Sequence, residues 1–316
     1  NNFVLGLFIQ YVWLGVLFGQ LSYLLWVLLD MSGLIVKLSD SSLLYDTRSI
    51  SYGLVKSGYL TYVENWRQLR LRGINVNPNI GSSWVDQGVP GADQYGFTLE
   101  DPKSPIVFIV GKGVATGVKK SGNAGTYLFA EADVNTKFYC FDLMKDDGIT
   151  GPGLRTWTPD GVLTFKSSQV PLNIIAAITA PPPGTPSRLG RPMTTYEGGR
   201  NERIRYQTRY SSASVHSVVD IPLGSGTEYA VFLPWNRSCG IIDTYAYNTL
   251  GGDIYGVAEG AYGRVGGISF FFATPGKTTA DQWFGQDVDI SYHLLPTDRY
   301  PTALVIKTTG LPFPFN

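Results

Sequence analysis

The sequence predicts a mainly β protein, with two β-sandwich-like domains preceded by one hydrophobic N-terminal helix. Short runs rich in Val, Ile, Thr and Tyr alternate with turn residues through most of the chain, which is typical of strands joined by tight turns. The 316 residues suit two domains of ordinary size. Residues 3–29 carry no charge and form a long apolar run of a different kind.

Residues 1–30 are the first predicted element, a hydrophobic helical segment. As a helix, residues 3–29 would extend roughly 40 Å at about 1.5 Å per residue, enough to cross a bilayer. Apolar side chains would surround this helix, so burial among sister copies in an oligomer is a second interpretation. A signal peptide is a third, but the segment has no basic leading residues and no clear cleavage site before Asp30. The sequence leaves the first two interpretations open.

Residues 31–180 are predicted to form the first β-sandwich domain. We expect a hairpin of residues 50–55 and 59–63, which turns at Lys56-Ser57-Gly58. Residues 64–104 are polar and rich in breakers, so they are expected to be loops. Residues 106–110 are continuously apolar, as in a buried strand. Further strands are expected at residues 34–38, 126–130, 136–143, 162–166 and 172–179, with a turn at 159–161.

Residues 181–192 are predicted to be a Pro-rich linker, because three successive prolines favour a stiff, extended chain. A second β domain is expected over residues 193–316. Its glycine-rich block, residues 251–267, would permit bulges and close approach of chains. The expected strands are residues 215–223, 229–233, 240–247, 254–258, 267–273, 288–294 and 303–308.

The composition argues against several functional classes. Lys plus Arg and Asp plus Glu both number 25, so no overall charge favours binding to nucleic acid. The two cysteines, Cys140 and Cys239, are too few for a disulfide framework. They are interpreted as two buried free thiols, with one disulfide as the alternative.

Motifs for catalysis are weak, so the chain is predicted not to be an enzyme and to use no cofactor and no metal. His216 and His293 are isolated, without the spacing of a zinc site. Ser217 is next to His216 on an expected strand and would point to the opposite face. Residues 276–278 (GKT) resemble the end of a phosphate-binding loop but lack the earlier glycine. Asp287 and Asp289 are interpreted as an exposed polar edge.

Partner-binding candidates come from arginine and aromatic residues. Arginine with tyrosine can bind acidic or aromatic groups, although a solvated strand face or a subunit contact is the favoured interpretation of this cluster. Tryptophans near turns can grip a carbohydrate or a protein. The candidates are Arg203, Arg205, Tyr206, Arg209, Trp235 and Trp283. Asn236-Arg237-Ser238 also matches a glycosylation acceptor, which matters only in a eukaryotic secretory pathway.

Four segments resemble minor tail proteins of long-tailed bacteriophages that infect Pseudomonas-like hosts. They are residues 31–37 (MSGLIVK), 50–58 (ISYGLVKSG), 104–110 (SPIVFIV) and 135–142 (NTKFYCFD). The resemblance covers about residues 31–180 and implies a virion protein of the distal tail, without catalytic residues.

The expected function is therefore a structural component of a tail tip or baseplate, contributing to fibre attachment or host-surface contact. The protein would be assembled in the bacterial cytoplasm and reside in the virion. Its partners would be other tail proteins, sister copies and a host glycan or envelope. The alternative is a membrane-anchored surface protein whose β domains bind a glycan or a protein.

Overall fold

The computed structural model describes residues 35–37, 43–46, 49–71, 84–146, 153–158, 160–205, 214–243, 251–275, 279–284 and 290–315. These residues form strands, turns and loops and contain no helix, so the mainly β prediction is confirmed for this part of the chain. The predicted helix over residues 1–30 lies outside the described residues. None of the described segments is a helix with the length and apolar character needed to span a bilayer.

The chain forms two compact units. One comprises Asn1–Leu54 and Phe141–Leu172, and the other comprises Val55–Cys140 and Asn173–Asn316. This division differs from the predicted one, because the second unit takes strands from both sides of residues 181–192. Two strands, β3 (Tyr52–Tyr59) and β9 (Lys137–Leu143), contribute residues to both units.

The smaller unit contains two antiparallel pairs of short strands. The first pair is β1 (Ile35–Lys37) with β2 (Leu43–Asp46), and the second is β10 (Arg155–Trp157) with β11 (Leu163–Lys166). Gly161 has a positive φ of 80° in the turn before β11, where a residue without a Cβ is favoured. The described residues of the predicted turn, Asp160 and Gly161, therefore lie in a turn as expected.

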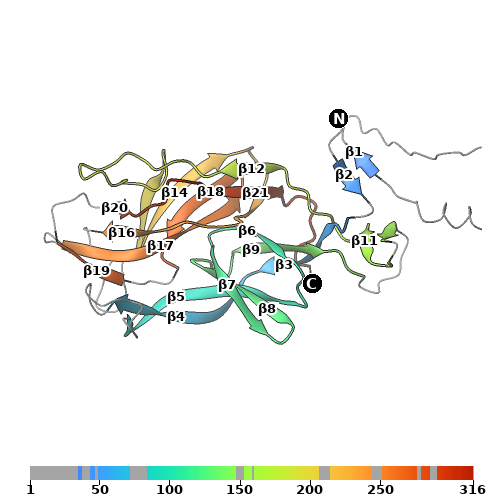
Figure 1. Cartoon of the computed structure of the whole chain (residues 1–316), viewed down its shortest axis with the longest axis horizontal. Coiled ribbons are helices and arrows are strands. Elements are labelled where there is room, and N and C mark those ends of the chain that lie inside the picture. Colours follow the sequence, from blue (N-terminus) through green and yellow to red (C-terminus); the bar gives the residue numbers. More distant parts are fainter. Residues whose placement is uncertain are drawn as a thin grey trace, which may run out of the picture. The chain divides into compact units, whose positions relative to one another are not determined.

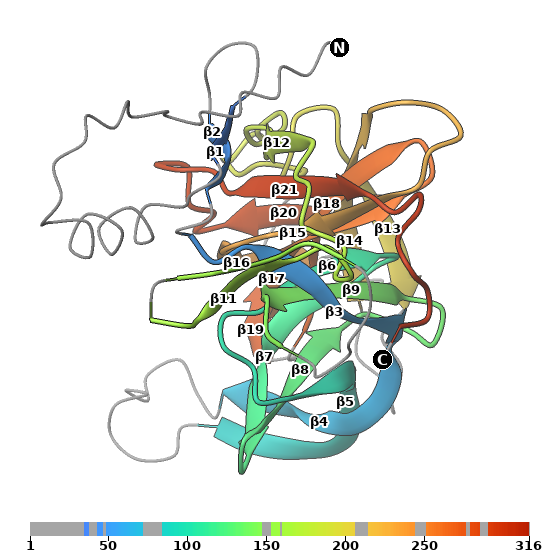
Figure 2. The same cartoon turned by 90° about the vertical axis from the view of Figure 1, so that its right-hand side faces the viewer.

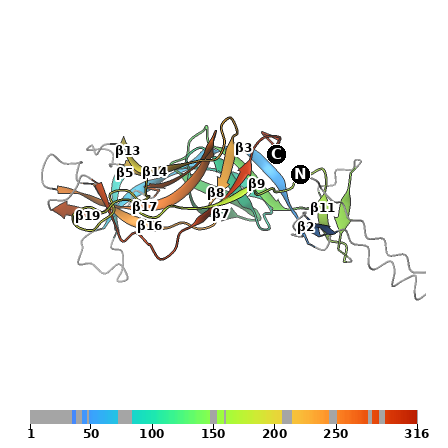
Figure 3. The same ribbon diagram turned by 90° about the horizontal axis from the view of Figure 1, so that it is seen from above.

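The larger unit holds most of the strands. Figure 1 and Figure 2 show β4 and β5 curving together beside β7 and β8. Figure 3 shows β16 and β17, which form an antiparallel pair, running along each other. Strand β18 pairs with both β17 and β14. The remaining bounds are β4 (Thr61–Leu71), β5 (Trp84–Glu100), β6 (Ile106–Val110), β7 (Val114–Ser121), β8 (Ala124–Ala130), β12 (Ala176–Thr179), β13 (Arg200–Arg205), β14 (Ser214–Pro222), β15 (Tyr229–Phe232), β16 (Ser238–Asp243), β17 (Gly251–Arg264), β18 (Gly267–Ala273), β19 (Thr279–Phe284), β20 (Ile290–His293) and β21 (Thr302–Lys307).

Strand β18 is buried on both faces and connects the two cores of this unit. Successive side chains of a strand point to opposite sides. Phe270 and Phe272 accordingly join one apolar cluster with β15, β16 and β21, while Phe271 joins another with β6, β8 and β9. The second cluster combines Phe129 and Phe138 with Val218, which lies beyond the Pro-rich segment. Burial of this second face explains why chain from both sides of residues 181–192 forms one unit.

Two local predictions between residues 50 and 104 are wrong. Strand β3 continues through the expected turn at residues 56–58, and the chain instead breaks at Leu60 before β4. Residues 64–71 and 84–100 are expected to be turn-rich loops, but they belong to β4 and β5, which form a long antiparallel pair. The expected breaker at Asp101-Pro102 does follow the end of β5, and residues 72–83 lie outside the described residues. The pairing has register irregularities at Arg67, opposite Pro90, which let a strand accommodate a residue without a backbone donor.

The Pro-rich segment is folded back on the chain that follows it. The Gly184 and Glu197 amides donate to the carbonyls of Thr194 and Pro182, respectively. Tyr196 is fully buried in the first apolar cluster. The prolines predict a stiff, extended linker over residues 181–192, and hydrogen bonds with residues 194 and 197 attach this segment to the chain that follows it.

Candidate functional site

The predicted arginine and aromatic candidates do not form one surface in the described residues. Arg203 is largely buried and makes two hydrogen bonds to the Asp243 carboxylate, at 2.6 and 2.5 Å. Arg205 ends β13, but its side chain lies outside the described residues, as do Tyr206 and Arg209. The backbone of Trp283 belongs to β19, and its side chain is likewise not described. Trp235, in contrast, lines a cavity.

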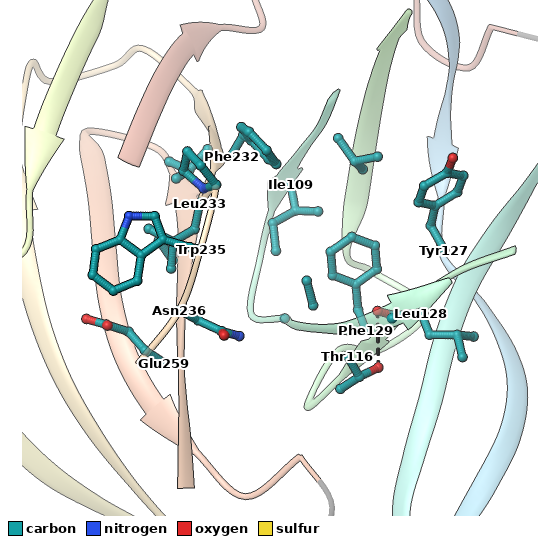
Figure 4. A pocket seen from close by; sticks show the side chains of 18 of the residues that line it. Ile109, Thr116, Tyr127, Leu128, Phe129, Phe232, Leu233, Trp235, Asn236 and Glu259 are labelled. Carbon is teal, nitrogen blue, oxygen red and sulfur yellow. Dashed lines mark hydrogen bonds between the residues drawn. The ribbon is translucent and has the colours of Figure 1, made fainter. Parts of the chain in front are cut away.

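This cavity has a volume of about 390 Å³ and lies within the larger unit. Figure 4 shows its side chains in two groups, with Trp235 and Asn236 on one side and Thr116 and Phe129 on the other. The volume falls in the range of roughly 300–1,000 Å³ that is typical of small-molecule sites. The lining is mostly apolar and comprises Pro105, Val107, Ile109, Gly113, Ala115, Thr116, Gly117, Val118, Tyr127, Leu128, Phe129, Val231, Phe232, Leu233, Pro234, Trp235, Asn236, Glu259, Gly260 and Ala261.

The two sides of the cavity meet where β6 pairs with β15, with Ile109 opposite Val231. The close packing of β17 against the chain after β6 and against β18 depends on Gly260. A Cβ atom on Gly260 would lie 2.6 Å from the Phe271 ring and 3.0 Å from the carbonyl oxygen of Gly113. The predicted close approach of chains in the glycine-rich block is thus confirmed at Gly260, on the floor of the cavity.

The rim of the cavity follows directly after β15. Pro234 and the residues after it connect β15 to β16, and this short connection exposes Trp235 and Asn236. The Trp235 side chain is 41% exposed. Within the described part of the chain, the Trp235 ring contacts no other ring and the Asn236 amide has no hydrogen-bond partner. Both groups are therefore available to a ligand.

A buried ion pair anchors this rim. The Arg237 guanidinium donates two hydrogen bonds of 2.8 Å to the Glu259 carboxylate, and the Tyr196 hydroxyl donates a third of 2.8 Å. Burial opposes the charge of Arg237, but Glu259 raises the pKa of the guanidinium above its ordinary value. Burial, together with the neighbouring Glu259, raises the pKa of Tyr196, which stays protonated as a donor. Glu259 thus reaches the cavity with its charge compensated.

A second, more polar cavity of about 300 Å³ lies beside His216. The Lys112 ammonium is 3.3 Å from Nδ1 of His216, and the Glu131 carboxylate is 3.1 Å from Nε2. An ammonium group only donates, so Nδ1 accepts and the Nε2–H donates to Glu131. Glu131 has a positive φ of 59°, a conformation that non-glycine residues seldom adopt.

Both ring nitrogens of His216 are therefore engaged, and the imidazole bridges β14 to the segment around Glu131. Ser217 lies on the other face of β14, where its hydroxyl accepts a hydrogen bond of 3.0 Å from the Thr195 amide. The predicted separation of these two neighbours is confirmed. Lys112 also bonds Glu202 at 3.1 Å. Burial opposes ionisation of Glu202, but Lys112, assisted by Arg200, lowers its pKa.

The remaining candidates from the sequence are the two cysteines and the possible metal and phosphate motifs. Cys140 and Cys239 are both free thiols. Among the described residues, no group of three His, Cys, Asp or Glu side chains is arranged to hold a metal ion. Residues 276–278, Asp287 and Asp289 lie outside the described residues.

Sequence reasoning identified Trp235 but missed most of the cavity. In the sequence, Asn236 stands out only as part of a glycosylation pattern, and no local motif marks Glu259. Phe129 belongs to an alternating strand pattern that any half-buried strand shares. These residues meet only through pairing between strands that are more than 100 residues apart, so no local signal distinguishes them.

Comparison with known proteins finds no matching family, no matching curated protein and no matching solved structure.

Proposed function

We propose that this protein is a structural component of a bacteriophage tail tip or baseplate that contributes to fibre attachment or host-surface contact. In this proposal, the chain beyond residue 30 is organised as β-sandwich-like lobes that serve as binding surfaces. The resemblance of residues 31–180 to minor tail proteins supports this placement. The balanced charge supports association with protein or glycan partners rather than nucleic acid.

One observation carries the contact role, namely the cavity beneath Trp235 and Asn236. An exposed indole, and an amide that has no partner among the described residues, lie at the mouth of a mostly apolar cavity, as is typical of a binding site. The charged groups of both cavities are engaged: Glu259 of this cavity bonds Arg237, and His216 of the second cavity bonds Lys112 and Glu131. This pairing favours recognition over acid–base chemistry, which needs a group free to exchange a proton with a reactant.

The proposal is tested on purified virions of a phage that encodes this chain. Mass spectrometry should find the protein in virions, and gold-labelled antibodies should place it at the distal tail in electron micrographs. The isolated protein should slow adsorption of the phage to host cells. Absence from purified virions, or labelling on the capsid alone, would contradict the proposal.

A second candidate is a membrane-anchored surface protein, favoured by the uncharged residues 3–29. It differs from the first in where the native protein is found. Recovery only from cell membranes, and only with detergent, would favour this candidate over the virion component.

A further inference from the structure

We infer that the cavity beneath Trp235 binds a neutral pyranose that carries a methyl-ended substituent, such as an acetamido group or the 6-methyl of a deoxy sugar. The inference deepens the proposed function, on which it rests, because it names the host-surface chemistry that the protein would contact. Three properties of the cavity support it: its lack of net charge, the polar and aromatic groups at its mouth, and the apolar character of its floor.

The cavity offers no counter-charge to an ionic ligand. Among the described residues that line it there is no Lys, Arg or His, and Glu259 is the one carboxylate. That carboxylate bonds Arg237, and both side chains are at most 1% exposed. An acidic sugar would therefore bury its charge without a partner, and a cationic ligand would compete with Arg237 for Glu259. A neutral ligand avoids both costs.

The mouth presents an aromatic ring, which can pack against the face of a sugar ring, and an amide, which can hydrogen-bond its hydroxyl groups. An exposed indole provides a flat apolar face against which the C–H bonds of a pyranose can pack. The Asn236 amide next to Trp235 has a donor and an acceptor, and neither is used within the described chain. On the facing side, the Thr116 hydroxyl donates to the Gln94 amide oxygen at 2.7 Å, with the Leu128 carbonyl oxygen as a second acceptor at 3.2 Å (Figure 4), and its oxygen remains an acceptor. Vicinal hydroxyl groups match this arrangement of donors and acceptors.

The floor selects against a sugar that is hydroxylated all around. It is formed by Ile109, Phe129, Val231 and Ala261, which offer no polar side-chain atom. A hydroxyl buried there would lose its hydrogen bonds to water, whereas a methyl group would gain contacts. A pyranose with a methyl-ended substituent can direct this group to the floor and keep its hydroxyls at the mouth.

The test is a titration of the full-length protein, followed by tryptophan fluorescence and calorimetry. The probes are the free sugars N-acetylglucosamine, N-acetylgalactosamine, rhamnose and fucose, compared with glucose and galactose and with glucuronic and N-acetylneuraminic acids. We expect the methyl-bearing neutral sugars to bind about fourfold tighter than glucose or galactose, the effect of burying one methyl group. Equal binding of all neutral sugars, or preferential binding of the acids, would overturn the inference.

Variants locate the binding. Trp235→Ala should weaken binding about tenfold or more, as the loss of a central aromatic contact does. Asn236→Asp, which replaces the amide donor with a carboxylate of the same shape, should weaken it as well. Trp157→Ala is the control, because Trp157 is 48% exposed and does not line the cavity. Trp235 and Asn236 are exposed, so the fold should persist, as circular dichroism would verify.

The outcomes separate this inference from the proposed function. If the protein occurs in virion tails and blocks adsorption but binds none of the sugars, the inference fails and the tail function stands. If the sugars bind and Trp235→Ala abolishes binding, but the protein is absent from virions, the ligand class stands and the tail placement fails. Sugar binding that Trp235→Ala leaves unchanged would also overturn the inference.

Discussion

Arg237 and Glu259 form an ion pair that is almost completely removed from water. Removing one charge from such a pair leaves the other buried without compensation, which typically costs about 3–5 kcal/mol. We predict that Glu259→Gln lowers the free energy of unfolding by about this amount, because the amide keeps the shape but cannot neutralise the guanidinium. Urea unfolding followed by circular dichroism measures the change.

An exposed ion pair provides the control for this prediction. Lys103 and Asp101 are 2.9 Å apart, and both side chains are more than half exposed. Such pairs contribute about 0–1 kcal/mol, so Lys103→Ala should have a small effect. If Glu259→Gln destabilises the protein no more than Lys103→Ala does, the buried pair does not anchor the rim.

His293 should make stability depend on pH. Burial lowers the pKa of its imidazole below the ordinary value of about 6.5, and the nearby Arg191 lowers it further. Between about pH 6.5 and the lowered pKa, the His293 imidazole is protonated in the unfolded state but stays neutral in the folded state. The resulting stabilisation is complete above about pH 6.5 and is lost as the pH falls through the lowered pKa.

We predict that the wild type loses more stability than His293→Asn when the pH is lowered from about 8 to 5.5. Urea midpoints of both proteins at each pH provide the measurement. Glu202 and Asp220, whose pKa values are lowered from ordinary values near 4, titrate below this window. Identical pH dependence of the two proteins would show that His293 does not cause the loss.

At the scale of the element, two glycines of β17 differ in whether the packing of the strand requires them. A Cβ atom on Gly263 would overlap the backbone oxygen of Tyr229. Gly256, in the same strand, is exposed and has no atom within 4 Å of such a Cβ. Gly263 is therefore required by the crossing of β17 over β15, whereas Gly256 is not.

We predict that Gly263→Ala destabilises the protein by about 1–3 kcal/mol, because neighbouring backbone must move. Gly256→Ala should leave stability unchanged or raise it by up to about 1 kcal/mol, since alanine restricts the unfolded chain. Thermal and urea unfolding of both variants test the pair. A larger loss for Gly256→Ala than for Gly263→Ala would contradict this account of the crossing.

The elements also show which local signals predict strands. Residues 106–110 are predicted as a strand from a continuous apolar run and residues 267–273 are a further strand candidate, and the two segments form β6 and β18. The start of β4 lies within the strand predicted over residues 59–63, but the rest of the β4 and β5 pair is not predicted, because polar residues and breakers dominate its sequence.

For the whole molecule, the second apolar cluster predicts that the chain beyond the Pro-rich segment does not fold alone. Phe271 packs with side chains that precede residue 181, including Phe129 and Phe138. A fragment of residues 193–316 would expose this face of β18, and we expect it to lack cooperative unfolding and to bind a hydrophobic dye. Co-expression with residues 1–192 should restore both properties. A dispersed NMR spectrum from the fragment alone would contradict the prediction.

The sequence by itself determined the β class, most strand positions in the second half and the candidacy of Trp235. These features follow from apolar runs, alternation and turn residues, which act over a few neighbouring positions. Only the tertiary structure decided that Asn236 shares a cavity with Phe129, that Arg203 pairs with Asp243, and that both faces of β18 are buried. The physical reason is that strand pairing and layer packing are decided by contacts between distant segments, whose partners leave no mark on the local pattern.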